Sequence, residues 1–125
     1  AESEKNDWLP YYYSAICYVL VAMEKKGKET DTWCDKAEFY CNKADSISAN
    51  NSEVKVLKSM ITAARITVHK VQRGQKNGAI ALRLADEAIK LNSKNPRAFY
   101  KKLQLFFIPQ RHLGEEPRKL SRMLN

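Results

Sequence analysis

The sequence predicts an all-α protein with about five helices, and three observations support this. Apolar residues recur at three- and four-residue steps along most of the chain, the spacing that places side chains on one face of a helix. The four Gly and four Pro stand mostly between such segments, where they end or begin helices. At 125 residues, 44% hydrophobic and 29% charged, the chain has the composition of one globular domain with its own core.

The first helix is expected to contain the most apolar stretch, Trp8–Met23, and to run to about Lys26. Asn6 or Asp7 can cap it, Pro10 is tolerated in its first turn, and Gly27 lies beyond its end. One face carries four residues at helical spacing: Tyr11, Ala15, Tyr18 and Ala22. Because this segment is apolar nearly all round, we expect it to lie between neighbouring helices.

The same stretch is neither a membrane span nor a signal peptide by its sequence. It is shorter than the roughly 20 apolar residues that a bilayer requires. Acidic rather than basic residues precede it, and no cleavage pattern follows it. The chain begins with Ala1 instead of methionine, so we expect that an earlier segment, such as a true signal peptide, has been removed.

The second helix is expected from a cap at Thr30 or Asp31 to about Ser48, and the third from a cap at Ser52. Each of these helices has an apolar stripe at three- and four-residue steps. The stripe of the second helix is Trp33, Ala37, Tyr40, Cys41, Ala44 and Ile47, and that of the third is Val54, Leu57, Ile61, Ala64, Val68 and Val71. Opposite the second of these stripes lies a polar one: Lys55, Lys58, Thr62, Arg65 and His69.

Two glycines and an asparagine interrupt the helical period at 73–78, which predicts a loop between the third and fourth helices. The fourth helix is expected from Ala79 to Leu91, and Pro96 occupies the first turn of the fifth. Beyond Phe107 no periodicity is present. These boundaries predict a flexible N-terminus at 1–6, a helical domain at 7–107 and an irregular tail at 108–125.

The net charge of +8 is concentrated in the second part of the chain. Residues 1–50 contain 6 Lys and 9 acidic residues, a balance of −3, whereas residues 51–125 contain 16 Lys or Arg and 5 acidic residues, a balance of +11. Such a surface attracts nucleic acid, anionic lipid or an acidic protein, or is simply solvated. No Lys/Arg run resembles a nucleic-acid-binding arm, which favours the solvated surface.

No residue pattern indicates an enzyme, a metal or a cofactor. His69 and His112 have no ligand partner at metal-binding spacing. Asp86 and Glu87 are adjacent and point to different sides of a helix, as solvated residues do. The three thiols of Cys17, Cys34 and Cys41 fit a core. Cys34 and Cys41 are too far apart along one helix to bond to each other, and Cys17–Cys41 is the one disulfide that we consider. We therefore expect neither catalytic residues nor a cofactor.

The ends of the second and fourth helices share small residues at a spacing of 44: Ala37, Cys41 and Ala44 correspond to Ala81, Ala85 and Ala88. This internal repeat resembles the tetratricopeptide repeat, in which small residues let paired helices approach closely. The period exceeds the usual 34 by about ten residues, and Cys41 and Ala85 stand where that family has an aromatic residue. The resemblance implies a right-handed array of antiparallel helical hairpins.

A narrower resemblance covers residues 7 to about 102. It is carried, in order, by Asp7-Trp-Leu-Pro-Tyr-Tyr-Tyr13, Lys43-Ala-Asp-Ser, Asn50-Asn-Ser-Glu53, Arg73-Gly-Gln-Lys-x-Gly78 and Asn95-Pro-Arg-Ala-Phe-Tyr100. These segments are similar to small exported tetratricopeptide-like proteins of the Bacteroidetes type. That family implies a periplasmic or cell-surface location, after removal of a signal peptide, and no known activity.

The chain departs from this family after the fifth helix, where the family continues with Tyr-Thr-Pro-Glu-x-Phe-Gly-Gly-Gly. Lys101–Lys119 can be encoded so that one nucleotide restored after the codons of Lys101 and Lys102 produces that motif. We therefore hypothesise that residues 103–125 are a frameshifted tail; a natural variable tail is the alternative. An exposed Leu105, Phe106 and Phe107 would then favour self-association.

The leading function hypothesis is a non-catalytic protein-binding or scaffold module. Its partner-binding candidates are aromatic residues of the first helix and basic residues of the second half: Trp8, Tyr12, Tyr13, Lys55, Lys58, Arg65, Arg73 and Lys76. In a helical array such residues line the concave surface, although core is the alternative for the aromatic ones and solvation for the basic ones. The alternative function is a basic module that binds nucleic acid or anionic lipid.

Overall fold

The computed structural model describes residues 7–106, apart from the side chains at positions 103 and 106, and this part is helical without strands. Five helices follow one another: α2 (Leu9–Glu24), α3 (Lys28–Ile47), α4 (Ser52–Ile66), α5 (Lys70–Leu91) and α6 (Pro96–Phe106). The predicted all-α fold of about five helices is confirmed. Within these residues no helix combines the length and apolarity needed to cross a membrane.

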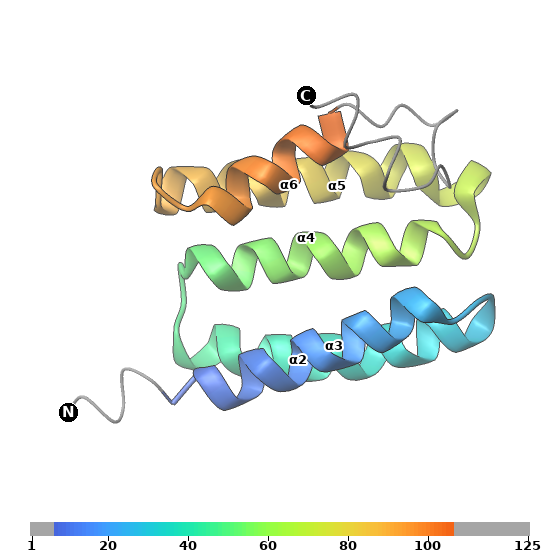
Figure 1. Ribbon diagram of the computed structural model, residues 1–125, viewed down its shortest axis with the longest axis horizontal. Helices are drawn as coiled ribbons and strands as arrows, with labels where there is room; N and C mark the ends of the chain where they lie inside the picture. Colours follow the sequence, from blue (N-terminus) through green and yellow to red (C-terminus); the bar gives the residue numbers. More distant parts are fainter. Residues whose placement is uncertain (1–6, 107–125) are drawn as a thin grey trace.

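The helices run back and forth, so that α2, α4 and α6 begin at one end of the molecule, while α3 and α5 end there (Figure 1). The pair α2–α3 forms one layer, and α5 and α6 form the opposite layer. Between the layers lies α4, which contacts all four other helices. This central position makes α4 the element on which both sides of the molecule are built.

The buried face of α2 keeps Ala15 and Ala22 of the predicted face but has Tyr12 and Val19 in place of Tyr11 and Tyr18. Tyr12, Ala15, Val19 and Ala22 are buried, whereas Tyr11 and Tyr18 are half-buried. The two half-buried rings stack on Tyr40 of α3, at centroid distances of 6.4 Å and 5.4 Å. The expectation that α2 lies between neighbours is wrong: it is the outermost helix of its layer, and Tyr13, Leu20 and Met23 are exposed along it.

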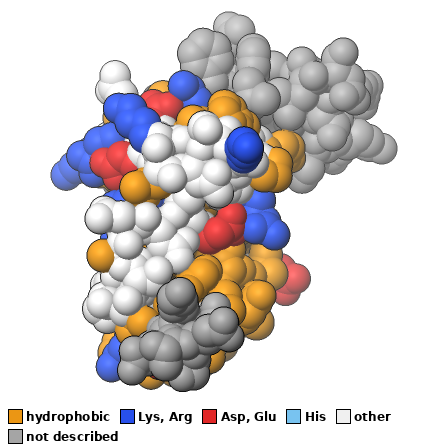
Figure 2. All heavy atoms as spheres, turned by 90° about the vertical axis from the view of Figure 1, so that its left-hand side faces the viewer, with side chains coloured by type: hydrophobic (Ala, Val, Ile, Leu, Met, Phe, Trp, Pro, Cys, Tyr) orange, Lys and Arg blue, Asp and Glu red, His pale blue; other side chains and the backbone are white. Residues whose placement is uncertain are grey.

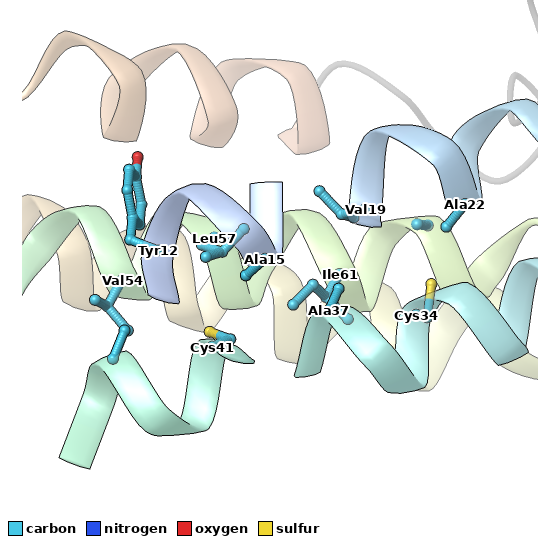
Figure 3. Close-up of a cluster of buried hydrophobic side chains, with 12 residues drawn as sticks. Tyr12, Ala15, Val19, Ala22, Cys34, Ala37, Cys41, Val54, Leu57 and Ile61 are labelled. Atoms are coloured by element: carbon cyan, nitrogen blue, oxygen red, sulfur yellow. The ribbon is translucent and has the colours of Figure 1, made fainter. Parts of the chain in front are cut away.

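The main core lies where α2, α3 and α4 meet, and Figure 3 shows their small and branched side chains converging between the three helices. Its centre is built from residues that leave little surface exposed: Ala15, Val19, Cys34, Ala37, Cys41, Val54 and Leu57. Alanine and cysteine at the α2–α3 contact let the two backbones approach closely. The predicted small-residue positions Ala37, Cys41 and Ala44 are therefore all buried, whereas Ile47 is exposed.

Helix starts differ from the predicted capping residues in three places. Before α2 stands Trp8, which makes no side-chain capping bond. The N-cap of α3 is Gly27, whose positive φ of 62° suits a residue without Cβ. The cap of α4 is Asn51, whose side-chain oxygen accepts from the backbone N–H groups of Glu53 and Val54, at 2.9 Å and 3.4 Å. Ser52, the predicted cap, points inward instead.

The predicted loop at 73–78 is wrong, because these residues belong to α5, which begins at Lys70. The preceding helix ends at Ile66 rather than at Val71, and the Val71 side chain is 92% exposed. Both glycines are helical, and Gly74 is buried. The Arg73 guanidinium, bonded to Asp31 and to the Arg65 carbonyl, anchors this end of the helix.

Serine hydroxyls attach α4 to α5. Ser59 donates to the carbonyl of Ala81 (2.8 Å) and Ser52 donates to that of Ala88 (2.7 Å). The side-chain amide of Asn95 donates to Ser52 (2.9 Å), and its oxygen accepts from the Arg97 backbone N–H to cap α6 at the predicted Pro96. The hydroxyls of Ser52 and Ser59 therefore both have partners, and they join α4 to α5 at both ends of the contact.

Three predictions fall outside the described residues. They are the flexible segment at 1–6, the irregular tail at 108–125 and the expectation that His112 is not a metal ligand. The frameshift hypothesis for 103–125 and the self-association surface at Leu105, Phe106 and Phe107 lie largely there too. Within the described part, α6 continues to Phe106, and Leu105 is partly buried.

Candidate binding groove

An apolar groove runs between α2 and α6, with α4 as its floor. It consists of two adjoining hollows of about 420 Å³ and about 490 Å³, both of which are lined by Val56 and Met60 of α4 and by Arg97 of α6. The first hollow is bordered by the beginning of α2, and the second by Met23 near its end. The parallel directions of α2, α4 and α6 bring these surfaces to one side of the molecule.

The first hollow combines aromatic side chains with one charged network. Trp8, Tyr12 and Tyr13 line it, and the Tyr12 hydroxyl donates to Glu53 Oε2 at 2.9 Å. Arg97 donates to the same carboxylate oxygen. Burial raises the pKa of Tyr12, and the hydrogen bond to Glu53 adds to this, so the phenol stays protonated. The network holds Glu53 neutralised at the junction of α2, α4 and α6.

The second hollow surrounds a buried lysine. Lys101 is only 9% exposed, and it lines the hollow together with Met23, Met60, Tyr100 and other residues of α4 and α6. Its ammonium donates to Gln104 Oε1 at 3.2 Å. Burial lowers the pKa of Lys101 to about 8, because charge is disfavoured away from water. A titratable amine is thus held in largely apolar surroundings.

The rim of the groove is open to solvent. Tyr13 and Met23 of α2 are 59% and 48% exposed, and Tyr100 of α6 is also exposed. Steps of three and four residues place Ile16 and Leu20 on the same stripe of α2 as Tyr13 and Met23. Figure 2 shows the end of the molecule at which α2, α4 and α6 begin, where hydrophobic side chains form a patch on one side, bordered by acidic and basic side chains. Such a patch on a monomer is typical of a contact surface.

The predicted partner-binding residues do not form one surface. Trp8, Tyr12 and Tyr13 line the groove, although Tyr12 is buried with its hydroxyl bonded. Lys76 is exposed on α5, and no ion pair of it is found within residues 7–106. The other four basic residues, Lys55, Lys58, Arg65 and Arg73, are each within ion-pair distance of a carboxylate.

Arg65 and Arg73 form the densest of these contacts. Arg65 donates to Asp31, Asp35 and Glu38 of α3 at 3.2, 2.7 and 2.8 Å. Arg73 binds Asp31 through two parallel bonds of 2.9 Å and 3.0 Å. These contacts lower the pKa of Asp31, the Arg73 hydrogen bond most of all. A phosphate group would have to displace these carboxylates in order to bind there.

The remaining ion pairs join single residues. Lys58 meets Asp45 at 2.8 Å, and Lys55 meets Glu87 at 3.4 Å. The adjacent Asp86 binds Lys102 of α6 at 2.8 Å. Asp86 and Glu87 therefore serve as partners of lysines that hold α4 and α6 to α5.

Other residues that line the groove were not predicted from the sequence: Glu53, Val56, Met60, Arg97, Tyr100 and Lys101. One signal was available for two of them. Arg97 and Lys101 are four residues apart and therefore share a face of α6. Lys101 also follows the fully buried Ala98 by three residues, so a charged residue stands on the helix face that packs inward.

The described residues contain no arrangement suited to metal binding, since no group of three His, Cys, Asp or Glu side chains converges within 7–106. All three thiols are free; Cys34 and Cys41 are buried and Cys17 is exposed, so the Cys17–Cys41 disulfide is not formed. Burial raises the pKa of Cys34 to about 11 and that of Cys41 to about 12. These two thiols are core residues and remain protonated at neutral pH.

Comparison with known proteins found no match: no family model, no curated protein and no solved structure matches the chain. The candidate groove is therefore supported by the geometry of the described residues alone. The resemblance to exported tetratricopeptide-like proteins stays a prediction.

Proposed function

We propose that the protein is a non-catalytic binding module that holds a segment of another protein in the groove between α2 and α6. The observation that carries this proposal is the continuous apolar floor of Val56 and Met60, flanked by the exposed side chains of Tyr13, Met23 and Tyr100. An open apolar groove with a few charged groups suits a peptide, which fills pockets with alternate side chains and keeps its backbone accessible.

The proposal includes a tetratricopeptide-like arrangement of the helices. Two facts support it. The small residues Ala81, Ala85 and Ala88 of α5 are buried, as are Ala37, Cys41 and Ala44, which lie 44 positions earlier on α3. The buried positions 54, 57, 61 and 64 of α4 likewise follow the buried positions 12, 15, 19 and 22 of α2 by a constant 42. Equivalent helices thus use equivalent faces.

Selection of short random peptides displayed on phage, with the full chain as bait, tests the function. We expect binders that recognise the wild type and lose about tenfold or more in affinity for Tyr13→Arg and for Met23→Arg, because a guanidinium replaces an apolar contact in each hollow. Both residues are exposed, so the substitutions should leave the fold intact; circular dichroism checks this.

Phe39→Arg is the matched control. Phe39 is 56% exposed on the outer side of α3 and lines neither hollow of the groove. Its replacement should leave the affinity of every groove binder unchanged. Peptides that bind the two groove variants as well as the wild type, or that respond only to Phe39→Arg, would contradict the proposed site.

We propose further, on the family resemblance alone, that the module acts in the periplasm or at the cell surface. Expression of the complete gene in its own host, followed by fractionation and detection with an antibody, tests this. Recovery with cytoplasmic proteins would contradict it.

A further inference from the structure

A second, more specific inference concerns the same groove and rests on the proposed function. We propose that the partner segment presents a carboxylate, from Asp, Glu or a chain end, beside apolar side chains, and that this carboxylate binds the ammonium of Lys101. The apolar neighbours then contact Met23, Val56 and Met60 in the same hollow. Chemically, the preferred ligand is an acidic apolar peptide.

Within residues 7–106, the ammonium of Lys101 has fewer acceptors than N–H donors. An ammonium has three N–H donors, and the described residues provide one acceptor, the neutral Oε1 of Gln104. Within residues 7–106 no carboxylate lies within ion-pair distance of Lys101. Burial of a charge without a countercharge is costly, and a carboxylate that enters the hollow removes much of this cost.

The other charged groups around this hollow are already paired. Arg97, one turn earlier on α6, is bonded to Glu53 of α4. Lys102, the next residue, is bonded to Asp86 of α5. The α2 and α4 side chains that line the hollow are Met23, Val56 and Met60, none of which is charged. Lys101 is therefore the group at which an incoming anion gains most.

The surroundings of Lys101 also define what accompanies the carboxylate. Two methionines and a valine line the hollow, and methionine side chains adapt to apolar groups of varied shape. The exposed Tyr13, Met23 and Tyr100 show that the groove is open along its length. An open groove suits a peptide better than an acyl chain, because ligand pockets for small apolar molecules bury most of the ligand surface.

The same peptide selection, repeated on two more baits, tests the proposal. We expect peptides selected on the wild type to be enriched in Asp or Glu next to Leu, Met or Phe. Selection on Lys101→Met should lose the acidic residue, and selection on Lys102→Met should keep it. A selected peptide should bind Lys101→Met about 30-fold more weakly, the effect of removing one member of a buried charge pair.

A second measurement follows the ammonium directly. In the free protein, NMR of the ¹³Cε-labelled lysines should report a pKa of about 8 for Lys101. Bound peptide should raise this pKa, because a carboxylate favours the charged form. Substitution of the peptide's acidic residue by its amide should abolish the increase. A merely structural role of Lys101 predicts no such response.

The outcomes separate the two proposals. Groove-dependent peptides without acidic enrichment would overturn the carboxylate proposal and leave the binding function standing. If the selection yields no peptide whose binding depends on Tyr13 or Met23, both proposals are overturned. Displacement of the peptide by dodecanoate at equal concentration would identify an acyl-chain site and overturn the peptide assignment.

The chain's own acidic pair, Glu115 and Glu116, is the remaining occupant to test. A double substitution to Gln in the full chain should leave the pKa of Lys101 and its peptide affinity unchanged. A lowered pKa of Lys101 in this variant, with tighter peptide binding, would show that the chain itself provides the carboxylate and would overturn the assignment to a partner.

Discussion

The pairing of basic side chains differs between the two sides of α4. Toward α3, Lys58 and Arg65 meet Asp31, Asp35, Glu38 and Asp45, and Arg73 joins them from α5. Toward the groove, Arg97 is bonded to Glu53, whereas Lys101 is more deeply buried than any of these residues and has only an amide as its partner within residues 7–106. A paired cation holds helices together, whereas a buried cation with only a neutral acceptor is better suited to bind something else.

This comparison also explains the charge asymmetry of the sequence. The acidic excess of the first 50 residues and the basic excess of the remainder partly neutralise each other where α3 meets α4 and the start of α5. Lys58, Arg65 and Arg73 of the basic part are therefore already bound to acidic residues of the first 50. A charge count along the chain records how many ions there are, but only the fold decides which of them face one another.

The largest expected effect is a gain in stability on the groove side. Below about pH 8 Lys101 is protonated, although its pKa in the folded protein lies below the ordinary 10.5. Below pH 8 this difference lowers the free energy of unfolding by about 3 kcal/mol, because the folded protein disfavours the charged lysine. The stability is regained as the pH rises from 8 to 10.5. Lys101→Met should therefore raise the free energy of unfolding at pH 7 by about 3 kcal/mol, measured with urea.

The gain should shrink above pH 8 and vanish above about 10.5, where the unfolded chain also loses this proton. Lys102→Met is the control, and should change stability by less than about 1 kcal/mol, because its pair with Asp86 is partly exposed. A Lys101→Met variant less stable than the wild type at pH 7 would mean that the ammonium already has a countercharge.

On the paired side the expected effect has the opposite sign. Asp31→Asn removes the charge that accepts two bonds from Arg73 and one from Arg65. Because the site is partly exposed, we expect the free energy of unfolding at neutral pH and low salt to fall by about 1–2 kcal/mol. Asp86→Asn, which affects one partly exposed pair, provides the smaller reference effect.

The same carboxylate predicts how stability depends on acid. Arg73 and Arg65 lower the pKa of Asp31 below 3.8 in the folded protein, so its contribution is complete above about pH 4 and is lost as the pH falls through the folded value. The stability difference between wild type and Asp31→Asn should therefore narrow below pH 3.8. A difference that is constant from pH 7 to pH 2 would exclude Asp31 ionisation as its source.

The smallest effect is expected for a single pair on the same side. Lys58 and Asp45 are 2.8 Å apart, with a quarter to a third of each side chain exposed. Lys58→Met should lower stability by less than about 1 kcal/mol, and about 1 M salt should remove most of that difference. A larger, salt-independent loss would show that the lysine stem contributes by packing.

Helix number and order could be predicted from the sequence because they follow from apolar periodicity and from Gly27, Asn50, Asn51 and Pro96. The start of α5 could not. Gly74 and Gly78 each cost about 1 kcal/mol relative to alanine in a helix. Contacts distant in sequence, such as Arg73 with Asp31, help to offset that cost, and no local pattern reveals them.

The aromatic residues of the candidate groove could be singled out from the sequence because Tyr13 stands in an apolar run, whose side chains are either buried or form a contact surface. Lys101 was missed for a physical reason. Its significance depends on the absence of a nearby carboxylate among the described residues and on Met23, Val56 and Met60 from two other helices. Such surroundings exist only after the chain has folded.

The central position of α4 has a consequence for motion. Because α4 contacts all four other helices, its amide hydrogens should exchange with solvent only when the whole domain unfolds. The outer helices α2 and α6 each pack against two other helices. We therefore expect their amide hydrogens to exchange faster than those of α4, which would leave Val56 and Met60 on the slowest-exchanging element of the groove.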